Sequence, residues 1–217
     1  MTGVQTCALP IWVRRNELAE FKRVPTQGKI GMGLDEGDRL VGVDVCDERH
    51  DILLAAAGGK AVRFPVESVR VFVSRSSEGV RGMDLAEGDE VISMSVLDHV
   101  ELTIDERDEY AKLAAARRRA AGEAENGDGE PEEPFEPKVL TPERIAELQA
   151  REQLILAITV NGYGKRTSAF EYRVTNRGTQ GIINIDTSER NGLVAATFPV
   201  AEDDQLMLVT DRGQTIR

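Results

Sequence analysis

The clearest pattern along the chain is a pair of short apolar runs separated by a glycine-centred turn. In residues 51–64 an apolar run leads to a Gly-Gly turn, which is followed by a second run that carries cationic residues. The same arrangement returns in residues 154–167 and in residues 205–217. Apolar runs of this length on either side of a glycine turn are typical of β-hairpins. The pattern therefore predicts three hairpins in an all-β chain.

Glycine-rich segments between these hairpins repeat at a fixed spacing. The segment that begins at Gln27 aligns without a gap with the segment from Glu78, so Gly28 corresponds to Gly79, 51 residues later. A third copy follows Gln180, where Gly181 lies 102 residues after Gly79, twice that spacing. Short strands repeated with a period near 50 residues are typical of propeller-like arrays. We expect an incomplete array of blades of about 51 residues, truncated at both ends.

One stretch interrupts the repeats and differs from them in composition. Residues 105–151 are rich in Ala, Glu and Arg, and they hold 13 acidic against 8 basic residues. The first part favours a helix, and the Gly- and Pro-containing part that follows is typical of a disordered linker. Thr141, Pro142 and Glu143 then form the start signal of a second short helix. We expect this charged helical insertion to project from a loop.

The first dozen residues contain no charged group and show neither a strand nor a helix period. They also lack the basic start of a signal peptide, so we interpret them as a non-native segment. The expected organisation is a non-native segment at 1–12, a partial blade at 13–50, a blade at 51–104, the insertion at 105–151, a blade at 152–203 and the start of a truncated blade at 204–217.

Composition narrows the function classes. The 217 residues include only two cysteines, Cys7 and Cys46, without the spacing of a disulfide framework or a zinc site. No membrane span is predicted, and the expected location is the cytoplasm. His50 and His99 stand apart from any second metal ligand, and the repeated Glu-Gly-Asp motifs favour tight turns over a metal or acid-base site. No catalytic residue and no metal site is predicted.

Four motifs in a fixed order give the chain a family resemblance. They are "GKAVRF" from Gly59, "EGVRGMDLAEGD" from Glu78, "NGYGKRT" from Asn161 and "SERNGLV" from Ser188. In this order and at this spacing they resemble the C-terminal domain of the DNA gyrase A subunit. The resemblance covers roughly residues 16–100 and 152–217.

The resemblance implies a fold and a role. The fold is a β-pinwheel, a propeller variant in which adjacent blades exchange strands. The implied role is to wrap double-stranded DNA without sequence preference, so that the whole type II topoisomerase can introduce negative supercoils. ATP and Mg would be used by the partner gyrase B subunit and the A2B2 holoenzyme, and no cofactor is expected in this chain.

Repeated cations are the expected DNA contacts, because wrapping needs positive charge against successive phosphates. The net charge of -11 does not oppose this expectation, since the insertion carries much of the acidic excess. The candidates follow the hairpin turns or lie near the glycine-rich segments. They are Lys60, Arg63, Arg75, Arg81, Lys165, Arg166, Arg173, Arg177 and Arg217. Gly59, Gly164 and Gly213 are expected to serve turns with positive φ.

The sequence also departs from the family. The Gln-Arg-Arg-Gly-Gly-Lys-Gly wrapping box is absent, and its positions read "RVPTQGK", "RSSEGVR" and "NRGTQGI". None of Tyr110, Tyr163 and Tyr172 has the Arg-Tyr-Thr setting of the cleavage tyrosine. Two alternatives remain open: the C-terminal domain of the topoisomerase IV A subunit, and a propeller-like scaffold that binds proteins. A free-standing enzyme is disfavoured, because no nucleophile-base pair or phosphate-binding glycine loop is present.

Overall fold

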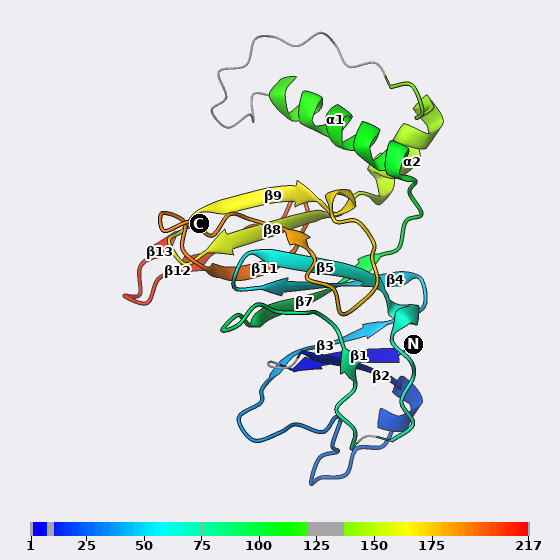
Figure 1. Ribbon diagram of the computed structural model, residues 1–217, viewed down its shortest axis with the longest axis vertical. Helices are drawn as coiled ribbons and strands as arrows, with labels where there is room; N and C mark the ends of the chain where they lie inside the picture. Colours follow the sequence, from blue (N-terminus) through cyan, green and yellow to red (C-terminus); the bar gives the residue numbers. More distant parts are fainter. Residues whose placement is uncertain (1, 8–10, 75, 121–136, 217) are drawn as a thin grey trace.

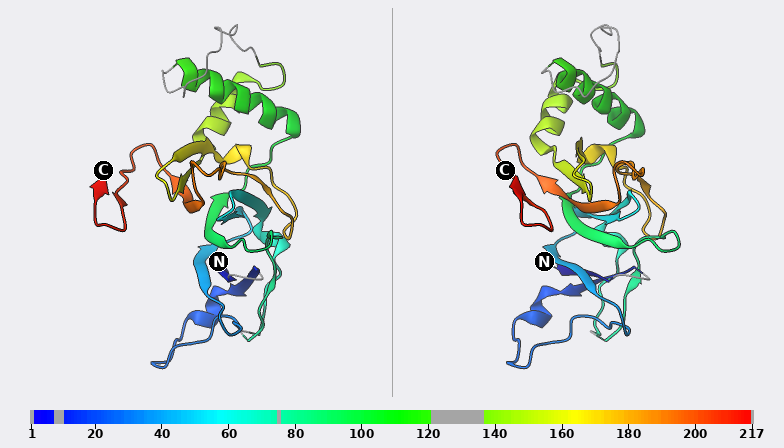
Figure 2. Two further views of the ribbon diagram at one scale, coloured as in Figure 1. Left: turned by 60° about the vertical axis from the view of Figure 1, so that its left-hand side comes forward. Right: turned by 90° about the vertical axis from the view of Figure 1, so that its left-hand side faces the viewer.

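The computed structural model describes residues 2–7, 11–74, 76–120 and 137–216. Its β-sheets are stacked one above another along the long axis, and two helices cover one end of the stack (Figures 1 and 2). Each of the three main sheets contains a hairpin that is followed by a short 3-10 turn. The all-β class with a helical insertion is therefore confirmed.

The first sheet has the strand order β3-β1-β2-β6. It contains β1 (Thr2–Cys7), β2 (Trp12–Glu17) and β3 (Leu40–Cys46), and its outer strand is β6 (Val80–Arg81). The expectation that residues 1–12 contain no strand is wrong, because β1 pairs with both β2 and β3. The sheet needs a strand between these two, and the backbone of Thr2–Cys7 fills that position. Their non-native origin stays a prediction.

The second and third sheets repeat this plan. The second has the order β10-β5-β4-β7, and the third has the order β11-β8-β9. A separate hairpin near the C-terminus pairs β12 with β13. The bounds are β4 (His50–Ala56), β5 (Lys60–Pro65), β7 (Val91–Asp98), β8 (Leu154–Thr159), β9 (Gly164–Ser168), β10 (Ile182–Ile183), β11 (Val194–Val200), β12 (Leu208–Val209) and β13 (Thr215–Ile216).

Apolar side chains between the sheets hold the stack together. One buried cluster joins the first and second sheets and includes Val13, Leu54 and Phe64. A second cluster joins the second and third sheets and includes Leu53 and Ile155. Because successive side chains of a strand point to opposite faces, Leu53 and Leu54 of β4 enter the two different clusters. The near-continuous apolar run in β4 thus reflects a strand that is covered on both faces.

Adjacent blades exchange short strands. The strand β6 comes from the second repeat but pairs with β2 of the first, and β10 comes from the third repeat but pairs with β5 of the second. This arrangement confirms the exchange that the family resemblance implied. A blade is therefore not one continuous segment, as the expected boundaries assumed, because its outermost strand is supplied by the repeat that follows.

Glycine is required where each exchanged strand meets the preceding blade. Gly79 and Gly181 have φ values of 132° and 73°. A Cβ atom on Gly79 would lie 2.4 Å from the carbonyl oxygen of Val13, and one on Gly181 would lie 2.1 Å from that of Ala61. The repeat glycines thus permit both a left-handed backbone and close contact between strands.

The hairpin turns also use glycine, with one correction to the sequence prediction. Gly59 and Gly213 have positive φ values of 85° and 75°, as expected. In the hairpin of β8 and β9, however, Gly162 has the positive φ of 84°, and Gly164 is the first residue of β9. The longer turn of this hairpin moves the left-handed position two residues earlier.

Three short 3-10 turns follow the hairpins, and two helices form the insertion. The turns are η1 (Leu18–Phe21), η2 (Val66–Ser68) and η3 (Ala169–Glu171). The helices are α1 (Ile104–Ala120) and α2 (Pro142–Arg151). The Thr141 side chain accepts a hydrogen bond from the Arg144 backbone N–H, which confirms the predicted cap of α2. The linker expected between the helices falls mainly on residues 121–136, which are outside the described part of the chain.

The insertion packs against the third sheet and does not simply project from a loop. Tyr110 of α1 and Leu148 of α2 form a buried cluster with Phe170 of η3. The rings of Tyr110 and Phe170 meet edge to face, with their centroids 5.4 Å apart. The apolar side chains spaced along the helices explain this docking. Neither helix is long and apolar enough to cross a membrane.

Candidate nucleic-acid interface

The 3-10 turns make residues of different repeats directly comparable. Glu17, Pro65 and Ser168 each cap one of these turns. Counting back two residues from each cap gives Arg15, Arg63 and Arg166, which therefore occupy one position of the repeat. Counting back three gives Arg14, Val62 and Lys165. These equivalences decide which of the predicted cations are available to a ligand.

Arg63 is not available, which corrects its assignment as a DNA contact. Its side chain is only 3% exposed, and its Nε donates to Asp51 Oδ2 at 2.8 Å. Its terminal nitrogens donate to the backbone oxygens of Ala169 and Asp98. Burial lowers the pKa of Arg63, and nearby Asp51 opposes this shift. The side chain joins the second blade to the third, so its function is structural.

The first repeat uses the same surface to hold the exchanged segment. Arg14 is fully buried and donates to the backbone oxygens of Ser74 and Ser77. Its guanidinium also lies 5.0 Å from the centre of the Phe72 ring. Neighbouring Arg15 is 7% exposed. In the first repeat both arginines are thus buried, and Arg14 contacts the segment that the following repeat supplies.

Lys165 and Arg166 occupy the same two positions in the third repeat but are exposed. Their strand, β9, is the edge of its sheet in the part of the chain that the structure describes. Arg166 forms an ion pair with Glu202 at 3.4 Å. Lys165 and Arg166 are therefore exposed because no exchanged strand pairs with β9 in the part of the chain that the structure describes.

The outer strands bring three other predicted cations together at the edges of the sheets. Arg81 lies in β6 with a side chain that is 57% exposed. Arg177 donates to the backbone oxygens of Arg81 and Ser68, so it lies next to Arg81 and links two repeats. Lys60, at the start of β5, donates to the Gln180 side chain at 3.3 Å. Arg81 and Arg177 thus lie at the edge formed by β6, and Lys60 lies beside the edge formed by β10.

A second repeated position precedes this edge, and sequence reasoning found only one of its members. Arg173 follows η3 and is exposed. Arg70 is its equivalent after η2, since Val71 and Val174 make matching parallel bridges to Arg15 and Arg63. Arg23 follows η1 in the same Arg-Val context and is also exposed. An alignment of the segments after the hairpins, in which Arg-Val recurs, would have revealed all three.

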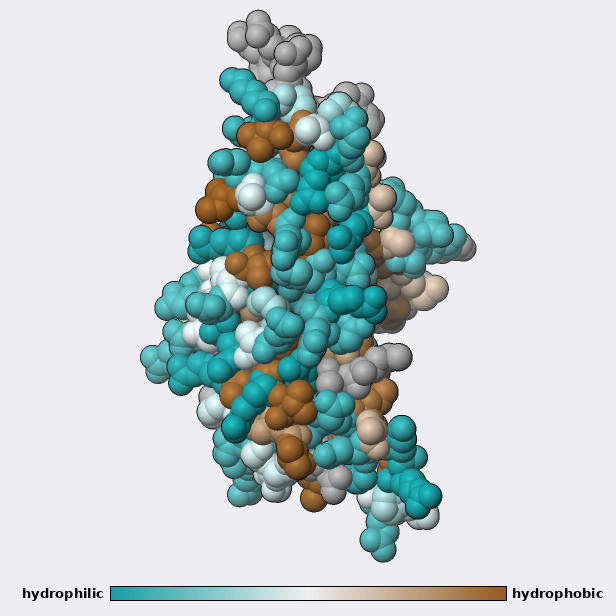
Figure 3. Space-filling view, turned by 90° about the vertical axis from the view of Figure 1, so that its right-hand side faces the viewer, coloured by the Kyte–Doolittle hydropathy of each residue, from teal (hydrophilic) through white to brown (hydrophobic). Residues whose placement is uncertain are grey.

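The segments that carry these arginines pass down the right-hand side of Figure 1. Figure 3 views this side and shows a mainly hydrophilic surface on which hydrophobic residues form separate patches. Two further predicted contacts, Arg75 and Arg217, lie outside the described residues.

The carboxylates of the repeats serve turns. The Asp89 side chain accepts hydrogen bonds from the backbone N–H groups of Gly58 and Glu90, both at 2.8 Å. Gly88 beside it has a φ of 78°. In the described ranges, no group of three or more His, Cys, Asp or Glu side chains is placed to hold a metal ion.

Comparisons with known proteins place this geometry in context. A family model described as "DNA gyrase C-terminal domain, beta-propeller" matches residues 13–47, 50–98 and 153–201. The DNA gyrase A subunit of Granulibacter bethesdensis is 53% identical to the chain over 94% of its length, and that of Escherichia coli is 34% identical over the same share. The chain spans 23% and 17% of these relatives.

Solved structures agree on the fold. A structure titled "Structure of DNA gyrase A C-terminal domain" has a TM-score of 0.64, with 20% sequence identity, and the match covers 99% of this chain and 54% of that one. A C-terminal domain of DNA topoisomerase IV has a TM-score of 0.66 with 17% identity, over 99% of this chain and 51% of that one. At these identities the likeness concerns the fold.

Proposed function

Because the chain belongs to the DNA gyrase C-terminal domain family, we propose that it binds double-stranded DNA along the outer edges of its blades and wraps it without sequence preference. The observation that carries the proposal is the repeated exposed arginine after each 3-10 turn. Arg70 and Arg173 occupy equivalent positions beside successive exchanged strands. A row of cations at the blade period suits a curved polyanion, since each can contact a phosphate without reading a base.

The proposed surface keeps some of the sequence-derived residues and replaces others. It contains Arg23, Lys60, Arg70, Arg81, Arg173 and Arg177. Lys165 and Arg166 are assigned instead to contact with a further repeat, because their equivalents Arg14, Arg15 and Arg63 are buried in that way. Arg177 has a double role, since part of its guanidinium already holds Ser68 and Arg81.

The proposal extends to the whole enzyme. The chain would position DNA for a type II topoisomerase that introduces negative supercoils, and it would itself make and break no bond. The catalytic tyrosine would lie elsewhere in the gyrase A polypeptide, and ATP hydrolysis with Mg would belong to the gyrase B subunit in an A2B2 assembly. Such an enzyme acts on chromosomal DNA, which places it in the cytoplasm of a bacterium.

The two other candidate functions make different predictions. A topoisomerase IV C-terminal domain would have the same fold, but the full-length relatives reported above are gyrase subunits. A protein-binding scaffold would show no salt-sensitive affinity for DNA. The salt dependence of DNA binding therefore separates the scaffold from the proposed function.

A salt series with a duplex of about 40 base pairs tests the proposed surface. The logarithm of the affinity should fall linearly with the logarithm of the salt concentration, because each phosphate contact releases counterions. Replacing both Arg70 and Arg81 by alanine should reduce the magnitude of this slope by about 1.8, or roughly 0.9 for each lost contact. Fluorescence anisotropy of the labelled duplex gives both quantities.

A matched variant controls for total charge. Lys112 and Arg117 are exposed cations of α1 that belong neither to the exchanged strands nor to the segments after the 3-10 turns, so replacing both by alanine removes the same charge without changing the proposed surface. Its slope should remain within about 0.3 of the starting value, because distant exposed charges are largely screened. Equal changes in the two double variants would show that net charge, and not the outer edge, determines binding.

A further inference from the structure

The insertion is fixed to the third blade by polar contacts as well as by its apolar cluster. The Glu109 carboxylate of α1 accepts hydrogen bonds from the backbone N–H groups of Lys138, Val139 and Leu140, at 2.5–2.9 Å. These bonds hold the segment that leads into α2 against α1. The Tyr110 hydroxyl donates to Glu152 at 2.8 Å and secures the end of α2. The two helices therefore behave as one body.

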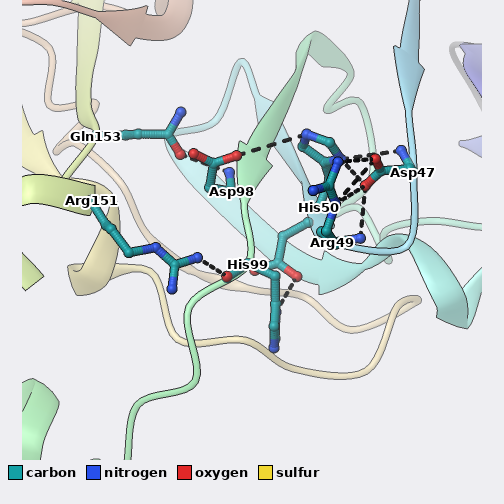
Figure 4. A network of polar contacts seen from close by, with 8 residues as sticks. Asp47, Arg49, His50, Asp98, His99, Arg151 and Gln153 are labelled. Carbon is teal, nitrogen blue, oxygen red and sulfur yellow. Dashed lines mark hydrogen bonds and ion pairs between the residues drawn. The ribbon is translucent and has the colours of Figure 1, made fainter. Parts of the chain in front are cut away.

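A second set of contacts attaches this body to the strand ends of the second blade (Figure 4). Arg151 of α2 donates to the His99 backbone oxygen at 2.8 Å, and the Gln153 side chain accepts from the Asp98 backbone N–H at 2.7 Å. The His99 ring contacts buried Asp51, also at 2.8 Å. The second blade thus holds the C-terminal end of α2, and α2 in turn packs against α1 in the cluster that contains Tyr110 and Leu148.

The fixed position brings the first half of α1 next to one of the proposed DNA contacts. Arg107 and Asp108 of α1 line a surface groove of about 430 Å³ together with Glu171 and Arg173 of the third blade. Asp108 is 56% exposed and forms an ion pair with Arg107 at 2.6 Å. A carboxylate and a partly neutralised arginine therefore lie beside Arg173.

The second repeat offers a natural comparison without a helix. Arg70 has the equivalent position, and its guanidinium lies 4.3 Å from the centre of the Phe72 ring. Each 3-10 turn supplies one glutamate, Glu67 in η2 and Glu171 in η3. At Arg173, α1 adds two charged residues to the groove, the Asp108 carboxylate and the Arg107 guanidinium. Asp108 is the carboxylate of α1 that lines this groove.

We propose that α1 sets the strength of DNA binding at the third blade, with Asp108 weakening phosphate contact at Arg173, so that Arg70 contributes more to binding than Arg173 does. The inference rests on the proposed DNA-binding function. Its physical basis is that a phosphate at Arg173 lies within about one Debye length, roughly 10 Å in 0.1 M salt, of any charge that shares the groove. Removing the carboxylate also frees Arg107 to face the same phosphate.

The test compares two neutral replacements of acidic residues in the insertion. D108N should bind the 40-base-pair duplex about two- to fivefold more tightly than the unchanged chain, in line with the modest strength of exposed charge interactions. E143Q removes the same charge from an exposed position of α2 that does not line the groove. Its affinity should stay within about 1.5-fold. R173A should weaken binding less than R70A, and the gain from D108N should shrink in the R173A background.

Each result has a definite meaning. Equal gains in D108N and E143Q would overturn the inference in favour of a general effect of net charge. Unchanged affinity in D108N, together with weaker binding in R70A, would overturn the inference and leave the DNA-binding function standing. If the unchanged chain shows no salt-dependent binding, the proposed function fails, and the inference fails with it.

Discussion

Gly181→Ala is expected to lower the free energy of unfolding by about 3 kcal/mol, because alanine would be strained at this backbone conformation and its Cβ atom would clash with the neighbouring strand. The φ of Gly181 is 73°, a conformation that costs L-residues about 1–2 kcal/mol. The added Cβ would also lie 2.1 Å from the Ala61 carbonyl oxygen, which belongs to the backbone and has little freedom to move. The strand β10 would have to leave β5.

Gly28 provides the matched control from within the same chain. It occupies the equivalent repeat position and has a φ of 82°, but nothing lies within 4 Å of the position that a Cβ atom would take there. Gly28→Ala should therefore cost only the backbone strain, about 1 kcal/mol. Urea denaturation followed by circular dichroism measures both variants. Similar losses at the two positions would mean that the exchanged strand tolerates displacement and that the close approach contributes little.

Arg63→Ala is expected to lower the free energy of unfolding by about 3–5 kcal/mol, because it leaves the carboxylate of Asp51 buried without its arginine. Asp51 is 0% exposed, and the guanidinium of Arg63 connects it with the Ala169 backbone oxygen of the neighbouring blade and with the Asp98 backbone oxygen of its own sheet. His99 would remain the second partner of Asp51. The loss should be measured by the same denaturation experiment.

Arg166→Ala is the control for this prediction, since Arg166 has the same repeat position but is 39% exposed and pairs with an exposed glutamate. Its replacement should change the stability by less than about 1 kcal/mol. A small loss in both variants would show that the buried pair is not needed for the packing of the blades. A large change in the DNA salt slope of Arg166→Ala would restore that residue to the binding surface.

Much of the architecture could be predicted from the sequence because it is encoded locally. The apolar runs around glycine turns predicted the hairpins, and the recurrence of Gly28, Gly79 and Gly181 predicted the repeat. Thr141 and Pro142 located the start of α2. Each of these signals depends on the conformational preferences of a few neighbouring residues, which do not need distant contacts to act.

The candidate site was harder to predict, because exposure is a property of the whole fold. Lys60, Arg81 and Arg177 were named from their placement in the repeats, and they do lie at the edges where strands are exchanged. Arg173 was named in the same way and is exposed at the repeated position that precedes this edge. Arg63 was named by the same reasoning but is buried. Charge next to a turn has the same appearance in a sequence whether the neighbouring blade covers it or leaves it in water.

The sequence by itself determined the repeat, the hairpins, the helices of the insertion and the family, since these depend on periodicity and local residue preference. Only the tertiary structure decided which strand pairs with which blade, because β6 and β10 join sheets whose other strands lie far away in the chain. That exchange buries Arg14 and Arg63 and leaves Arg81 exposed. The free energy of a cation depends on whether neighbouring segments remove it from water, and this is settled only when the blades come together.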